Sequence, residues 1–241
     1  MFCYSLPLLS DPLKSYQTLG FAIVEAFTLK EVRDIQHFAT SWVNALLHQS
    51  VKDIPSLPLE NYHIWSKEYP IPHGEIFKAM NRHRGDCEEM KSVLLNARVR
   101  GFLSSIGVEK FDLRDEGLGW LAFRFIRPGA GDGYPMTKKE WGIAKEVISF
   151  WVPVIGSSDR ETIALVPGSH LKEYDGYLPE NQKFRKDEYR LKGTILEENI
   201  FRPSLNPGDV VIYHPKTLHS EDVQQSTITR LNLEFRIQCS S

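Results

Sequence analysis

The second half of the chain is built from short runs of β-branched and aromatic residues, and this pattern limits the possible folds more than any other feature. The runs are GWLAFRFIRPG, VISFWVPVI, ETIALVPGSH, GDVVIYHP and TRLNLEFRIQC, spread over residues 119–239. Each is bounded by Gly, Pro, Asn or Asp, as strands usually are. Five such strands without helices between them predict an antiparallel barrel or jelly roll.

The last run predicts a strand with one apolar face and one polar face. Leu231, Leu233, Phe235 and Ile237 alternate with Arg230, Asn232, Glu234 and Arg236. Successive side chains of a strand point to opposite faces of the sheet, so one face of this strand packs on a core and the other is polar. A polar face turned into the mouth of a barrel is a binding surface.

The first half of the chain predicts helices around this barrel. A turn glycine precedes a strand at 21–24, and Thr28 with Glu31 forms a capping box at the start of a helix over 29–48. A proline-rich stretch from 53 to 74 predicts a long loop, and residues 75–107 predict one or two helices. We expect a single domain over 1–241, in which 1–118 forms a strand, helices and a lid and 119–241 forms the jelly-roll core.

Charge and cysteine usage exclude several classes of partner. The chain has 29 Lys and Arg against 31 Asp and Glu, and it contains no basic tract, which argues against nucleic-acid binding. No stretch approaches the ~20 apolar residues of a membrane span, and the N-terminus lacks the cationic region of a signal peptide. Three scattered cysteines fit a reduced, cytoplasmic protein. Homo-oligomerisation stays open.

Three stretches together resemble the phytanoyl-CoA dioxygenase family of iron(II)- and 2-oxoglutarate-dependent oxygenases. They are VISFWVPVIGSSDRETIALVPGSHLKEY, LNPGDVVIYHPKTLHS and STITRLNLEFRI. The resemblance implies a double-stranded β-helix with flanking helices. It also implies that His219 matches the distal iron ligand, that Arg230 matches the arginine that binds 2-oxoglutarate, and that Trp151 lies beside that cosubstrate. A planar guanidinium suits such a carboxylate because it donates two parallel hydrogen bonds.

The resemblance fails where the other two iron ligands belong. The family's His-x-Asp pair should lie in AGDGYPMTKKEWGIAKE, residues 130–146, which contains no histidine. Thr137 or Lys138 stands at the histidine position, and Lys139 or Glu140 at the aspartate position. One imidazole flanked by ammonium groups holds iron(II) poorly. Unusual ligands remain an alternative, with Asp132 or Glu140 as the carboxylate and a loop histidine, His63, His73 or His83, as the second imidazole.

The hypothesis that follows is a jelly-roll protein with a degraded iron site and no cofactor. Its barrel mouth would bind or transform a small anionic metabolite without iron redox chemistry. Arg230, Trp151 and Arg124 would bind the ligand, with Arg127 nearby, and His219, Lys138, Lys139 and Glu140 would serve acid–base catalysis. One alternative is an active hydroxylase that uses iron(II) and 2-oxoglutarate through unusual ligands. Another is an interaction module without pocket chemistry.

Overall fold

The structure is a computed structural model of the 241-residue chain. It describes residues 11–50, 58–69, 88–113, 121–129, 147–156, 162–177, 190–221 and 226–239.

The largest element is an antiparallel sheet in the order β1-β8-β4-β10-β2, with β3 also paired to β10. Its strands are β1 (Phe21–Glu25), β2 (Phe111–Leu113), β3 (Leu121–Ile126), β4 (Val147–Ile155), β8 (Asp209–Tyr213) and β10 (Arg230–Cys239). The two edge strands β1 and β2 come from the first half of the chain, so the barrel sheet is built by both halves.

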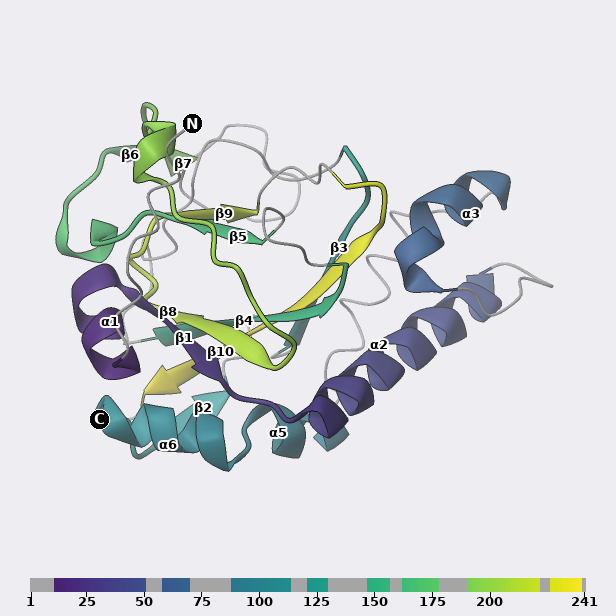
Figure 1. Ribbon diagram of the computed structural model, residues 1–241, viewed down its shortest axis with the longest axis horizontal. Helices are drawn as coiled ribbons and strands as arrows, with labels where there is room; N and C mark the ends of the chain where they lie inside the picture. The colour runs from purple at the N-terminus through teal and green to yellow at the C-terminus, as the bar shows by residue number, and fades with distance from the viewer. Residues whose placement is uncertain are drawn as a thin grey trace.

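Shorter strands form a second layer. β5 (Ile163–Leu165) pairs with β9 (His219–Glu221), and β6 (Gly176–Tyr177) pairs with β7 (Arg190–Leu191). The β5–β9 pair lies above the large sheet in Figure 1, and the chain passes between the layers from β4 to β5 and from β8 to β9. This arrangement confirms the predicted double-stranded β-helix, a jelly roll that is mainly β with flanking helices.

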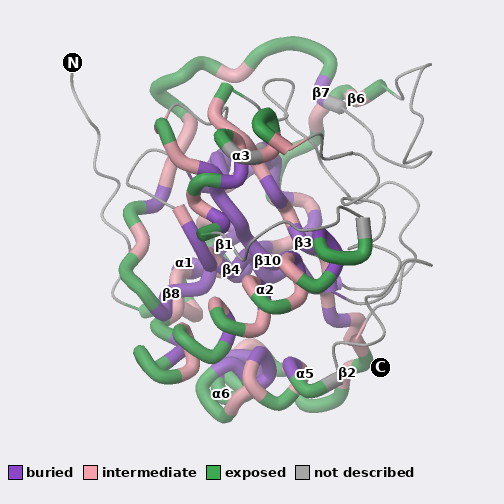
Figure 2. The backbone as a smooth tube through the Cα atoms, turned by 90° about the vertical axis from the view of Figure 1, so that its right-hand side faces the viewer, coloured by how far each residue is buried: buried purple, intermediate pink, exposed green. Residues whose placement is uncertain are grey.

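Helices cover the other face of the large sheet. The α-helices of the described chain are α1 (Pro12–Leu19), α2 (Leu29–Ser50), α3 (Tyr62–Glu68), α5 (Glu88–Leu94) and α6 (Ala97–Ser105). Short 3-10 helices η1 (Leu59–Asn61), η3 (Ser169–Leu171) and η4 (Glu197–Asn199) lie in the connections. In Figure 1, α2, α5 and α6 lie below the sheet, on the side away from β5 and β9. Figure 2 shows the buried residues gathered in the strands between these layers. The main core therefore lies between the sheet and the helices.

Local sequence signals explain the start of α2. The Glu31 carboxylate accepts a hydrogen bond from the Thr28 backbone N–H at 2.7 Å, and the Thr28 hydroxyl accepts one from the Glu31 N–H at 3.2 Å. The backbone N–H and the hydroxyl of Thr28 both donate to the Glu31 carboxylate, and these two bonds hold the pKa of Glu31 below its usual value because they favour the ionised form. Asn96, the N-cap of α6, also donates to Glu31 at 3.1 Å. The predicted capping box is confirmed, and it links two helices.

The predicted strands and the long helix are confirmed in place, whereas one loop prediction is wrong. Residues 62–68, within the proline-rich stretch expected to be a loop, form helix α3. Among the described residues, no helix is both long and apolar enough to cross a membrane.

Candidate functional site

The polar face of β10 points between the two layers. Leu231, Leu233, Phe235 and Ile237 belong to the helix-facing core, as predicted. On the opposite face Arg230 and Asn232 are completely buried and Glu234 is 8% exposed. Burying so many polar groups is costly unless hydrogen bonds satisfy them. A strip of this kind inside a barrel is typical of a binding site.

One part of the inner wall is apolar and closely packed. Trp151 is fully buried in a cluster formed with Phe21, Ile163, Leu165, Val211 and Tyr213. The ring of Phe21 stacks on Phe201 at 5.4 Å, and the β-bridge between Leu165 and Phe201 holds that segment in place. Trp151 was predicted to contact a cofactor, and the structure places it in the wall beside the polar strip.

His219 begins β9 and lies 5% exposed against Tyr213, with 4.7 Å between the ring centroids. Its Nδ1 lies 2.7 Å from the backbone oxygen of Thr217. A carbonyl oxygen only accepts hydrogen bonds, so Nδ1 carries the proton and the lone pair of the neutral ring is on Nε2. This tautomer suits either a metal ligand or a general base.

The turn before His219 is braced from two sides. The Thr217 hydroxyl donates to the Gly20 carbonyl at 2.8 Å, and the Leu218 N–H donates to the buried Ser169 hydroxyl at 2.9 Å. Gly20 has φ 83°, and a Cβ there would lie 2.5 Å from both Thr217 Oγ1 and His170 Nδ1, so only glycine fits. The Pro-Gly-Ser-His turn thus fixes the segment that carries His219.

Arg230 lies near the start of β5, whereas His219 lies beside its last residue. The Arg230 Nη1 is 3.5 Å from the Thr162 carbonyl oxygen, whereas His219 pairs with Leu165, three residues further along β5. At ~3.3 Å per residue, the two ends of this stretch are separated by about 10 Å. Arg230 and His219 therefore contact positions of this stretch that are about 10 Å apart, a length that a small molecule can span.

Arg124, which was predicted to bind the ligand, forms an ion pair on β3 and β10. It pairs in register with Asn232, and its Nε lies 3.3 Å from Glu234 Oε2. The two side chains are only 19% and 10% exposed. This ion pair is neutral as a whole and lines the inner surface beside Arg230.

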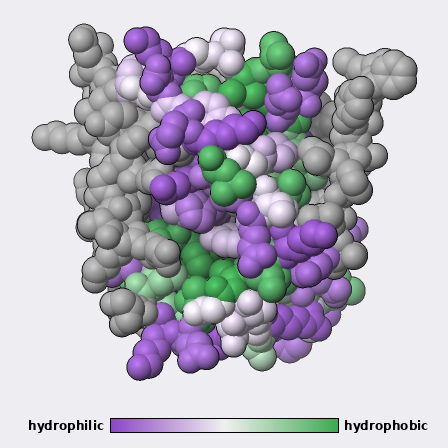
Figure 3. Space-filling view, turned by 90° about the vertical axis from the view of Figure 1, so that its left-hand side faces the viewer, coloured by the Kyte–Doolittle hydropathy of each residue, from purple (hydrophilic) through white to green (hydrophobic). Residues whose placement is uncertain are grey.

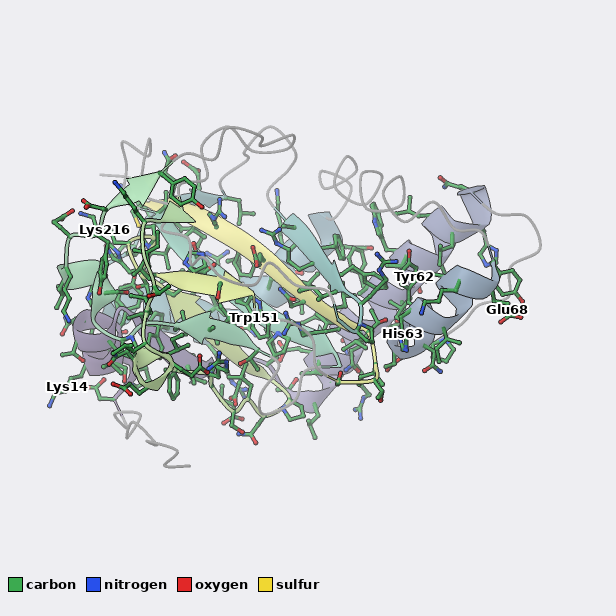
Figure 4. The ribbon with its side chains drawn as sticks, turned by 90° about the horizontal axis from the view of Figure 1, so that it is seen from above. Lys14, Tyr62, His63, Glu68, Trp151 and Lys216 are labelled. Carbon is green, nitrogen blue, oxygen red and sulfur yellow. The ribbon has the colours of Figure 1, made fainter. Side chains whose placement is uncertain are left out.

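The start of α3 is attached to the residue that precedes Arg230. Thr229, fully buried, donates its N–H to Glu60 O at 2.7 Å. Its hydroxyl oxygen lies 3.2 Å from the His63 N and 3.1 Å from His63 Nδ1. Tyr62 packs edge-on against Phe125 at 4.4 Å, and burial raises the pKa of Tyr62 to about 12. Figure 4 shows Tyr62 and His63 together at the α3 end of the barrel, with Trp151 further inside. The name α3 clasp is used below for residues 59–63 with Thr229.

Several predicted residues lie outside the part of the chain that the structure describes. They are Lys138, Lys139, Glu140, Thr137, Asp132, His73 and His83. Within the described residues, no group of three or more His, Cys, Asp or Glu side chains is arranged to hold a metal. The sequence has no histidine between His83 and His170. Of the residues that match the family's pattern, the described part of the chain contains His219, one possible metal donor, and Arg230, whose guanidinium suits a carboxylate.

Sequence reasoning missed Thr162 and Thr229, whose contacts locate Arg230 in the barrel. Thr229 was recognisable only by its position before the arginine, because its burial depends on α3. A separate hollow of about 470 Å³ lies outside the barrel, between residues 173–175 and 191–195. It belongs to the side shown in Figure 3, where hydrophobic and hydrophilic side chains are mixed.

Comparisons with known proteins agree with the jelly roll. No protein-family model matches the sequence. The non-heme monooxygenase ThoJ, in its apo form, superposes with a TM-score of 0.62 at 15% identity, over 95% of this chain and 77% of that one. EctD from S. alaskensis with bound Fe gives 0.55 at 13% identity, over 99% and 79%. The alpha-ketoglutarate-dependent carbocyclase SnoK gives 0.52 at 14%, over 97% and 85%. At these identities the likeness establishes one thing: the chain has the double-stranded β-helix fold of the non-heme oxygenases.

Proposed function

We propose that this protein binds a small carboxylate metabolite inside the barrel, without the family's iron centre. The observation that carries the proposal is the fully buried guanidinium of Arg230, on the same inner surface as the imidazole of His219. A guanidinium binds a carboxylate strongly because it donates two parallel, charge-assisted hydrogen bonds, which offset the cost of removing both groups from water.

The size of the ligand follows from the spacing of these residues. A five-carbon acid has a carbon chain of about 5 Å, and a hydrogen bond of about 3 Å at each end extends its reach to about 11 Å. This length matches the separation of about 10 Å estimated along β5. The packed apolar wall around Trp151 favours a slender ligand over a bulky one.

His219 supplies the chemical capability of the site. The Nδ1–H bond to Thr217 O fixes the ring so that Nε2 accepts a proton. A neutral imidazole held in this way acts as a general base near neutral pH. The protein therefore either binds the acid only or moves one of its protons; Lys138, Lys139 and Glu140 remain proposed participants.

The test is binding measured in the presence of a metal chelator. Isothermal titration with 2-oxoglutarate and glutarate should give saturable binding to the wild type in EDTA. Arg230→Lys keeps the charge but loses the paired donors, so it should weaken binding about 10- to 100-fold. Glu68→Gln, on the exposed side of α3, is the control and should bind normally. If the wild type bound neither 2-oxoglutarate nor glutarate, the proposal would be refuted.

A second candidate is an active iron(II)/2-oxoglutarate hydroxylase with unusual ligands. It is favoured by the similar structures of EctD, which contain Fe or 2-oxoglutarate with 5-hydroxyectoine, and by the tautomer of His219. Reconstitution with iron(II) under anaerobic conditions, followed by assay of succinate released from 2-oxoglutarate, separates the two. Stoichiometric iron with turnover would replace the first proposal by the second.

A further inference from the structure

The residue that precedes Arg230 is held by contacts to which no function has been assigned. Thr229 is fully buried, and both its backbone and its side chain bond to the α3 clasp. Its N–H donates to Glu60 O at 2.7 Å, and its hydroxyl oxygen accepts from the His63 N–H at 3.2 Å and lies 3.1 Å from His63 Nδ1. The chain that enters β10 is therefore attached to α3 through the backbone and the side chain of one residue.

Arg230 depends on this attachment because it lies at the very start of its strand. β3 pairs with it through Ile126, whereas the pairing of β4 with β10 begins at Leu231. On the β4 side, Gly156 approaches closely: its φ is 71°, and a Cβ there would lie 2.4 Å from the Thr229 carbonyl oxygen. The backbone of Arg230 is thus fixed by β3 directly, and by Gly156 and the α3 clasp through Thr229.

The side chains of Thr229 and Arg230 point to different sides of the sheet. Arg230 reaches Thr162 on the inner side, whereas Thr229 contacts α3. In Figure 1, α3 lies at the end of the molecule where β10 starts, outside the space between the two layers. His63 and Thr229 therefore act on a ligand in the barrel only through the position of Arg230.

The clasp is also an element that opens easily. Helix α3 has seven residues, and a helix of that length is held by its contacts, here the buried side chains of Leu59 and Tyr62 and the bonds to Thr229. Elements of this kind open locally at a lower free energy than the whole fold. If the intact clasp holds Arg230 in the orientation that binds a carboxylate, a bound carboxylate must stabilise the clasp by the same free energy.

We infer that Thr229 and His63 are positioning residues for the guanidinium of Arg230, and that carboxylate binding in turn stabilises the α3 clasp. The inference rests on the proposed function, because Arg230 must first bind a carboxylate. It adds to that function an element outside the barrel that controls the affinity and responds to the ligand.

Isothermal titration with glutarate in EDTA, well below the melting temperature, tests the positioning role. Thr229→Val removes the hydroxyl at nearly constant volume and should weaken binding about 3- to 10-fold, as expected for a lost hydrogen bond. Thr229→Ser keeps the hydroxyl and should bind as the wild type does. In an Arg230→Lys background, Thr229→Val should weaken binding less than about twofold further, because the group that it positions is gone.

Thr28→Val is the matched control. It removes another threonine hydroxyl, that of the α2 capping box, and should lower the melting temperature while leaving glutarate affinity unchanged. A clasp that only stabilises the fold would make Thr229→Val behave in the same way.

Hydrogen exchange of the wild type tests the response to the ligand and needs no variant. Saturating glutarate should slow the exchange of the amides in residues 59–68 about threefold or more, and should leave α6 unchanged. Unchanged exchange of residues 59–68, wild-type affinity in Thr229→Val, or an equal loss in the Arg230→Lys background would each overturn the inference and leave the proposed function in place. If the wild type binds neither 2-oxoglutarate nor glutarate, the proposed function fails, and the inference fails with it.

Discussion

At the scale of single residues, His170 shows how a half-buried imidazole makes stability depend on pH. Its Nε2 donates to Gln17 O at 3.1 Å, and its Nδ1 is buried without a hydrogen-bond partner among the described residues. Burial lowers the pKa of His170, and the bond to Gln17 opposes that shift only in part. The ring of His214 lies 5.6 Å from that of His170. The folded protein therefore favours the neutral form of His170.

The sign of the effect follows from proton linkage. The unfolded chain binds the proton first, so the stabilisation is complete above the unfolded pKa of about 6.5 and is lost as the pH falls through the lower folded pKa. The free energy of unfolding from urea titrations between about pH 7.5 and about pH 5 should fall less steeply in His170→Gln than in the wild type. The control His48→Gln, at an exposed position of α2, should keep the wild-type slope. Equal slopes in all three proteins would contradict the prediction.

At the scale of elements, the α3 clasp is held by contacts that a sequence pattern does not reveal. The pattern predicts α2 and β10 because many residues repeat with one period in each. Helix α3 has only seven residues, and an isolated helix of that length is unstable in water. It is stabilised by Phe125 and Thr229, residues distant in sequence, and this explains why residues 62–68 were predicted to be a loop.

The clasp predicts an energetic coupling between α3 and the start of β10. His63→Ala and Thr229→Val each remove one side of the same hydrogen bond, so their effects on unfolding should not add. A double-mutant cycle should give an interaction energy of about 0.5–1.5 kcal/mol. A control cycle that combines His48→Ala with Thr229→Val should give no interaction energy. Additive effects of His63→Ala and Thr229→Val would show that the contact contributes nothing to stability.

At the scale of the whole molecule, the sequence predicted the strands that carry the site better than the buried side chains that line it. His219 and Arg230 were singled out because the segments that contain them resemble those of a known family, and the polar face of β10 follows from simple alternation. Thr162 and Thr229 were missed because nothing local distinguishes a threonine on an inner face from one in solvent. Their burial depends on segments brought together from distant parts of the chain. Such residues emerge only once the register is known.

The fixed position of His219 predicts that an iron site can be restored. His219 keeps the Nδ1 bond that orients a metal ligand, and its turn is fixed by Thr217 and Ser169. If the sequence alignment of the 130–146 segment is right, Thr137→His combined with Lys139→Asp supplies the two ligands that the chain lacks. Three protein donors should hold Fe(II) or Co(II) at least about 100-fold more tightly than one. Metal content after dialysis, measured by elemental analysis, is the readout.

Adding His219→Ala to the double variant is the control, and it should abolish the gain because it removes the one ligand placed by the described strands. Metal should also stabilise the double variant and raise its melting temperature. At a metal concentration a hundredfold above the dissociation constant, the free energy of stabilisation is about 2.7 kcal/mol. A double variant that folds but gains no affinity would show that residues 137 and 139 do not face His219. Stoichiometric iron in the wild type would show instead that other donors already complete the site, and the chain would then be a hydroxylase.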